Sequence, residues 1–121
     1  MSDQLDSQEQ MQRRVLMLSG DLMFSSRVKS AVERAGKHFQ LSGSLPEAAS
    51  DAVEFVIVDL STRSGTLPNV AEQCAQVCPQ AKLIAYGPHV QVDKLEAARQ
   101  AGIPTVMTNG QFDRSLGSLF G

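Results

Sequence analysis

The 121-residue chain contains no tryptophan, and aromatic residues make up only 5% of it. A protein that stacks nucleic-acid bases needs several aromatic side chains on one surface, so this composition argues against such a surface. Positive charge is not in excess either, because 11 Lys and Arg stand against 13 Asp and Glu, for a formal net charge of −2. We therefore expect neither a nucleic acid nor an anionic membrane surface as a partner.

Cysteines and long hydrophobic runs are also scarce. The two cysteines, Cys74 and Cys78, are too few for a disulfide framework. The longest apolar runs have four or five residues, well short of a membrane span. No N-terminal stretch joins a basic start to an apolar core, as a secretory signal would. These absences predict a cytoplasmic protein.

The sequence also lacks motifs that carry cofactor binding or catalysis. It has neither the GxGxxG motif of dinucleotide sites nor the GxxxxGK[ST] motif of phosphate-binding loops. Its two histidines, His38 and His89, have no Ser or Cys nucleophile at a recognisable spacing. We therefore expect no enzymatic activity and no cofactor.

What the chain does contain, from about Arg14 onward, is a regular alternation of apolar runs and polar turns. Residues 1–13 are rich in Gln, Ser and Asp and are predicted to form a flexible tail, whereas residues 14–121 are predicted to form one domain. The short apolar runs predict strands over residues 15–18, 38–41, 55–58, 82–86 and 104–108.

Apolar residues three and four positions apart predict helices between these strands. The predicted helices cover residues 24–35, 47–51, 67–78, 92–101 and 112–120. Asp21 is expected to cap the first helix and Gly36 to end it, whereas Pro46 opens the second. The polar segment 61–66 is predicted to be a loop. Together these elements predict a doubly wound α/β fold, a three-layer sandwich around a five-stranded parallel sheet.

Ligands of such folds bind beyond the carboxyl ends of the strands. Any site is therefore expected among the residues that follow four of the predicted strands. These residues are 19–21, 59–61, 87–89 and 108–110.

Five strand–helix units, with Asp59 at the end of the third strand in FVIVDL, resemble the receiver domain of two-component response regulators. The helix–Gly–strand spacing of AARQAGIPTVMTNGQF is similar to the receiver pattern as well. The resemblance covers Arg14 to Gly121 and implies the strand order 2-1-3-4-5 of the flavodoxin-like fold. It also implies that Asp59 is the position of the phosphoacceptor.

The other functional positions of receivers differ in this chain. The acidic pair that binds Mg²⁺ in the family corresponds to Ser19 and Gly20, with Asp21 following. The family's Thr or Ser after the fourth strand corresponds to Gly87, and its Lys after the fifth strand corresponds to Asn109.

These differences weaken the expected chemistry. Mg²⁺ needs oxygen ligands in near-octahedral geometry, and Asp59 and Asp21 would supply few of them. Without the metal and the Lys, nothing obvious neutralises a phosphoryl group on Asp59. The sequence therefore predicts a pseudo-receiver, meaning a receiver-like domain that is not phosphorylated by the usual Mg²⁺-dependent route. Asp59 is then expected to fix loop geometry by accepting hydrogen bonds from its neighbours.

A pseudo-receiver is expected to work through protein–protein interaction in signalling, with a protein partner or as a homodimer. The resemblance implies a contact surface made by the fourth helix, the fifth strand and the fifth helix. In this chain that surface would draw on Val92, Ile103, Gln111 and the C-terminal helix. We expect any transcriptional output to come from a separate protein.

Several alternatives remain open at the level of sequence. The chain could be an atypical phospho-receiver that uses Asp59, or a binder of small molecules or anions at the strand ends, with His89 as a cleft residue. The segment DLSTRSG is similar to a stretch of anti-anti-sigma (STAS) domains, which gives a second fold hypothesis. Cys74 and Cys78, four positions apart on a helical stripe, are predicted to pack in the core rather than bind a metal.

Overall fold

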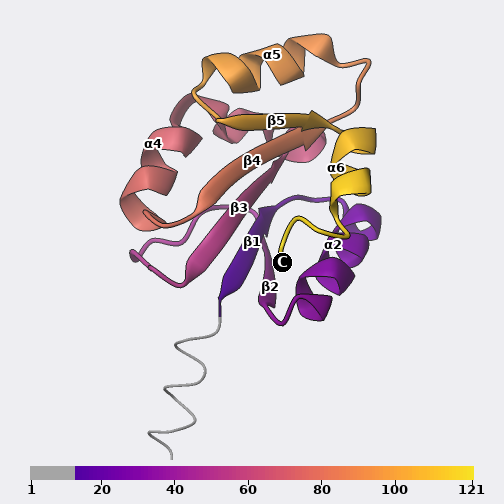
Figure 1. The fold of residues 1–121 in the computed structure, drawn as a ribbon. Coiled ribbons are helices and arrows are strands. Elements are labelled where there is room, and N and C mark those ends of the chain that lie inside the picture. The colour runs from indigo at the N-terminus through magenta and orange to yellow at the C-terminus, as the bar shows by residue number, and fades with distance from the viewer. Residues whose placement is uncertain (1–12) are drawn as a thin grey trace, which may run out of the picture.

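Five parallel strands form the centre of the structure, a computed structural model that describes residues 13–121 (Figure 1). The strands are β1 (Arg14–Leu18), β2 (His38–Ser42), β3 (Val53–Asp59), β4 (Lys82–Gly87) and β5 (Thr105–Thr108). Their order is β2-β1-β3-β4-β5, so the predicted doubly wound α/β fold and strand order are confirmed. The predicted tail lies outside the described residues except for Arg13.

The strands are apolar because both faces of the sheet are covered. Successive side chains alternate between the faces, so that Phe55 and Ile57 belong to one hydrophobic core and Val56 and Val58 to the other. The helices are α2 (Leu22–Arg34), α3 (Leu60–Arg63), the 3₁₀ turn η1 (Ser64–Thr66), α4 (Leu67–Val77), α5 (Val92–Gln100) and α6 (Asn109–Ser115). Helices α2 and α6 pack on the first face, and α3, α4 and α5 on the second.

The predicted ends of α2 are confirmed. The Asp21 side chain accepts hydrogen bonds from the N–H groups of Met23 and Phe24 and so caps the helix. Gly36 follows the helix with φ +78°, a left-handed conformation that favours glycine. The cap places the start of α2 directly after the carboxyl end of β1.

The helix predicted over residues 47–51 does not form, because residues 43–52 adopt bends and irregular structure between β2 and β3. A single isolated turn does not offset the cost of helix nucleation. Local contacts also hold the backbone in another shape. The N–H of Ser50 donates to the carbonyl of Val77, and its hydroxyl accepts from the N–H of Ala52.

Two other expectations need correction. The predicted loop 61–66 is helical, because the Asp59 carboxylate accepts the N–H of Ser61 and so caps α3. The C-terminal helix ends at Ser115, and the following turn lets Phe120 bury against the sheet. The STAS hypothesis is also wrong, because β2, the additional strand that argued against it, is an integral edge of the receiver-like sheet.

Three stacked aromatic rings join α2, β4 and α6 near the carboxyl ends of the strands. The Tyr86 ring centroid lies 4.5 Å from that of Phe112 and 5.1 Å from that of Phe24. An ion pair between Arg27 and Asp113 joins the same two helices outside the stack. The short helix α6 is therefore held mainly by its buried aromatic side chain.

The substitution Phe112→Ala should lower the free energy of unfolding by about 3–5 kcal/mol, because it leaves a cavity and removes two ring contacts. Urea unfolding followed by circular dichroism measures the change. Val92→Ala is a matched control at an exposed helical position and should shift stability by no more than about 0.5 kcal/mol. A loss below about 1 kcal/mol for Phe112→Ala would show that the stack does not hold α6.

Candidate functional site

The candidate site is built around Asp59, which ends β3 and is only 2% exposed. One carboxylate oxygen, Oδ2, accepts hydrogen bonds from the hydroxyls of Ser19 and Thr62, each at 2.8 Å. The other oxygen, Oδ1, accepts the backbone N–H of Ser61 at 3.0 Å. A buried carboxylate is costly without such partners, and here three protein groups supply them.

The two hydroxyls also accept hydrogen bonds from the β1–α2 connection. The Ser19 hydroxyl accepts the N–H of Asp21 at 2.9 Å, and the Thr62 hydroxyl accepts the N–H of Gly20 at 2.9 Å. Each hydroxyl thus accepts a hydrogen bond from a backbone N–H and donates one to Asp59. We call the hydrogen bonds among Ser19, Gly20, Asp21, Asp59, Ser61 and Thr62 the Asp59 network. It joins the first connection of the chain to the start of α3.

Tyr86 lies beside this network, since it is the cross-strand neighbour of Asp59 on β4. Its hydroxyl is buried and, within residues 13–121, makes no hydrogen bond of normal geometry. Burial raises the pKa of Tyr86 most strongly, and the negative charges of Asp59 and Asp21 raise it further, while the nearby Ser19 hydroxyl opposes the shift. The phenol therefore stays neutral in the physiological range.

The Mg²⁺ ion of receivers does not fit the residues present here. One oxygen of Asp59, Oδ2, already accepts hydrogen bonds from the hydroxyls of Ser19 and Thr62, and Asp21 directs its carboxylate to the N–H groups of α2. Over the described part of the chain, no three residues of the types His, Cys, Asp and Glu are grouped closely enough to hold a metal. Mg²⁺ is held in proteins mainly by carboxylates and water, and the positions of the receiver acidic pair carry Ser19 and Gly20 instead.

A fixed cation also lies at the mouth of the site. A Cβ atom on Gly20 would be 3.5 Å from a terminal nitrogen of Arg63, and one on Gly43 would be 3.6 Å from the other. The Arg63 guanidinium therefore lies against both glycines, and the absence of side chains at these positions leaves room for it. Positive charge at this position opposes the entry of a divalent cation.

Other predicted site residues do not join the Asp59 network. A Cβ atom on Gly87 would be 3.2 Å from the Cβ of Leu60, so the space that a Thr or Ser would need is crowded by a fully buried leucine. Asn109 begins α6 half-buried, and its Oδ1 is buried without a hydrogen-bond partner in the described structure. His89 is exposed on the β4–α5 connection. The network therefore uses Asp59 with residues 19–21 and none of these three.

Sequence reasoning missed Thr62, Tyr86 and Arg63. A sequence signal existed for Thr62, because a Thr three residues after a helix-capping Asp lies in the first helical turn, within reach of that carboxylate. The positions of Tyr86 and Arg63 depend on the strand register and on the two glycines, which only the three-dimensional structure reveals.

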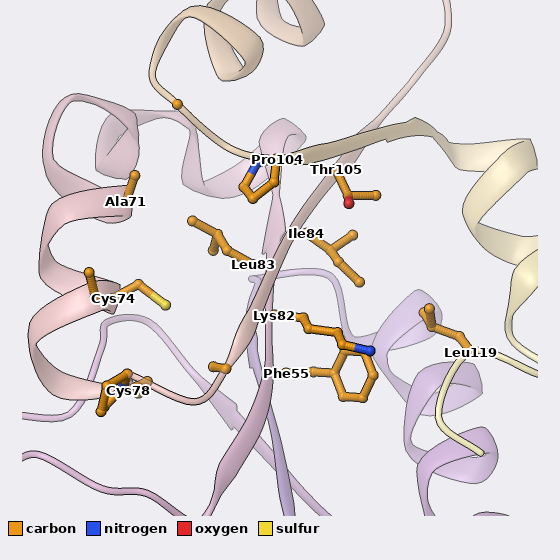
Figure 2. Close-up of a pocket in the computed structure, with 14 residues that line it drawn as sticks. Phe55, Ala71, Cys74, Cys78, Lys82, Leu83, Ile84, Pro104, Thr105 and Leu119 are labelled. Atoms are coloured by element: carbon orange, nitrogen blue, oxygen red, sulfur yellow. The ribbon is translucent and has the colours of Figure 1, made fainter.

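A separate hollow of about 540 Å³ lies at the other end of the sheet, beside the first residues of β4 (Figure 2). Its wall is mostly apolar and includes Leu83, Pro104 and the two cysteines of the α4 segment. Burial, helped by the neighbouring Cys78, raises the pKa of Cys74 to about 11. Burial also raises the pKa of Cys78. The two thiols are therefore neutral core groups, as predicted.

Comparison with solved structures shows the same fold in response regulators. The CheY-like receiver domain of Methanospirillum hungatei JF-1 matches with a TM-score of 0.65 and 15% identity, over 87% of each chain. The beryllofluoride-activated NtrC4 receiver domain dimer matches with a TM-score of 0.61 and 17% identity, over 88% of this chain and 95% of that one.

A third neighbour comes from outside the response regulators by name. A Burkholderia pseudomallei K96243 protein provisionally related to pilus assembly matches with a TM-score of 0.60 and 18% identity, over 91% of this chain and 87% of that one. No protein-family model and no curated protein sequence matches the chain. The chain therefore has the CheY-like receiver fold, and at these identities the likeness extends to the fold alone. Among residues 13–121, no helix is long and apolar enough to cross a bilayer.

The Asp59 network can be tested at Thr62, whose hydroxyl both donates to Asp59 and accepts from Gly20. Thr62→Val should lower the free energy of unfolding by about 1–2 kcal/mol, because a hydrogen bond to a charged group is lost. Thr62→Ser keeps the hydroxyl and should recover most of the loss. Ser61→Ala is the control, since Ser61 contributes its backbone N–H and not its hydroxyl to the Asp59 network. Equal stabilities for Thr62→Val and Ser61→Ala would show that the network contributes nothing to folding.

The raised pKa of Cys74 predicts slow thiol chemistry. With a pKa of about 11, only about one Cys74 thiol in a thousand is ionised at pH 8, and the thiolate is the reactive form. Reaction with a disulfide reagent should be at least about tenfold slower in the folded protein than in urea, and should accelerate as pH rises toward 11. The Cys78→Ala variant isolates the Cys74 signal. Rapid reaction at pH 8 in the folded state would contradict the assigned environment.

Proposed function

We propose that this chain is a pseudo-receiver, a non-catalytic signalling module that acts by binding another protein and is not switched by Mg²⁺-dependent phosphorylation. One observation carries the proposal, namely that three protein donors already bind the buried Asp59 carboxylate. Ser19, Thr62 and the N–H of Ser61 supply three hydrogen bonds to it. In this arrangement Asp59 fixes the loops around it rather than accepting a phosphoryl group.

The charge and packing around Asp59 support the same proposal. A phosphoryl group needs cations that neutralise it during transfer, and the receiver positions that would supply a metal and a lysine carry Ser19, Gly20 and Asn109 instead. Crowding of Gly87 by Leu60 also leaves little room for the hydroxyl that receivers carry at that position. The Arg63 guanidinium lies against Gly20 and donates to the backbone carbonyl of Thr62.

For the contact surface we favour the region around α5, β5 and α6. Val90 and Val92 are 74% and 63% exposed at the start of α5, and Gln111 is exposed on α6. Ile103 does not belong to this surface, contrary to the sequence-based expectation, because it is buried in the core beneath α5. Exposed valines of this kind are suited to an apolar contact on a protein partner.

A ¹⁵N NMR titration with Mg²⁺ and beryllofluoride, which mimics a phosphoryl group on aspartate, tests the proposal. We expect no shift changes in the residues around Asp59, and no acylphosphate by mass spectrometry after treatment with acetyl phosphate. A receiver domain with the complete acidic pair serves as the positive control for both reagents.

The Asp59→Asn variant separates the possible outcomes. Wild-type shifts that spread to β4 and β5 and vanish in Asp59→Asn would overturn the proposal and identify an atypical phospho-receiver. Shifts with beryllofluoride or other anions that persist in the variant would indicate an anion binder at the strand ends. A thermal-shift series with nucleotides and anions completes this comparison, because a ligand of the folded state raises the melting temperature.

A further inference from the structure

Strand β2 forms one edge of the sheet. It pairs with β1 on one side, and no other strand of the described chain pairs with its far side. Proteins usually protect such edges with Lys, Pro, a bulge or a covering segment, because free backbone groups attract another strand. The β2 sequence HFQLS contains no Lys, Arg, Asp, Glu or Pro, and its pairing with β1 is regular throughout.

The direction of the backbone groups follows from the pairing with β1. His38 donates its N–H to the carbonyl of Arg13, and the carbonyl of Ser42 accepts the N–H of Ser19. Backbone groups alternate in direction along a strand, so the odd-numbered residues Phe39 and Leu41 turn their N–H and C=O groups away from β1. These groups form a short, regular row of donors and acceptors along the edge.

Lys37, the residue before β2, does not protect this edge. The Lys37 ammonium donates to the carbonyl of Phe120 and pairs with the Glu54 carboxylate at 3.2 Å, which directs it toward the sheet face covered by α2 and α6. Leu41 is 36% exposed. Gln40 lies on the other face and lines a hollow of about 480 Å³ between β2 and the irregular segment 44–50, so there is space beside its side chain.

We propose that β2 pairs in antiparallel fashion with β2 of a second copy of this chain, which joins two sheets into one. The twofold axis would pass beside Gln40, so that Phe39 of one copy lies opposite Leu41 of the other. In this register the outward N–H and C=O groups of both residues are paired in both copies. The proposal does not rest on the proposed signalling function, and it uses a different surface from α5, β5 and α6.

The pattern of side chains favours a second copy over an unrelated strand because it is self-complementary. Phe39 and Leu41 place apolar groups opposite each other on one face, and Gln40 meets its own equivalent on the other face, where two amides can exchange hydrogen bonds. No like charges meet along the strand. The small net charge of −2 also gives little repulsion between two approaching copies.

A charge swap at Gln40 tests the proposal, since this residue would face itself across the axis. Gln40→Lys and Gln40→Glu should each weaken dimerisation by about 2–5-fold, because like charges then lie directly opposite one another. An equimolar mixture of the two variants should dimerise at least as well as the wild type. Sedimentation velocity of the full chain over a concentration series at low salt measures this. Gln76→Lys and Gln76→Glu, at an exposed position on α4, should change nothing.

Amide hydrogen exchange supplies an independent readout. Protection of the Phe39 and Leu41 amides should rise with protein concentration, whereas the His38 amide, already bonded to Arg13, should change little. A monomer at every concentration would overturn the proposal, whether these two amides exchange fast or are covered by another part of the same chain. A dimer that is unaffected by Gln40→Lys and Gln40→Glu but dissociates in Val92→Asp would place the interface on α5. That result would also overturn the proposal.

Discussion

The structure around the strand ends depends on one requirement, that a carboxylate removed from water must be surrounded by donors. Asp59 meets this requirement with two hydroxyls and one backbone N–H. Both hydroxyls are in turn fixed by N–H groups of the β1–α2 connection. A single side chain therefore fixes both the β1–α2 connection and the start of α3. Asp59 thereby helps to fix the structure of both connections.

The likeness to receivers concerns the architecture, and the chemistry of the site depends on the neighbours of Asp59. A fold shared with CheY-like domains provides an aspartate at the carboxyl end of the central strand. What that aspartate can do depends on its neighbours, and here they are hydroxyls, a guanidinium against Gly20 and a leucine against Gly87.

The architecture could be predicted from the sequence because buried parallel strands produce continuous apolar runs. The helices that cover them produce apolar residues three and four positions apart. The resemblance around Asp59 then gave the strand order, which periodicity does not contain. Two local segments were predicted wrongly because interactions of individual residues decide their structure. The segment 47–51 follows the helix-opening Pro46 but is too short for a stable helix. Segment 61–66 is helical because a carboxylate caps its start. The neighbours of Asp59 could not be predicted from the sequence. Their positions depend on the strand register, which brings Tyr86 beside Asp59, and on the packing of the surrounding side chains.

Tyr86 is the only tyrosine of the chain, and there is no tryptophan. Its ring stacks on Phe112 and Phe24, while its hydroxyl faces the neighbourhood of Asp59. The near-ultraviolet absorption, circular dichroism and intrinsic fluorescence of the whole protein therefore come mainly from one residue at the candidate site. The molecule carries its own spectroscopic probe, so that a change in the surroundings of Asp59 can be followed without any label or added chromophore.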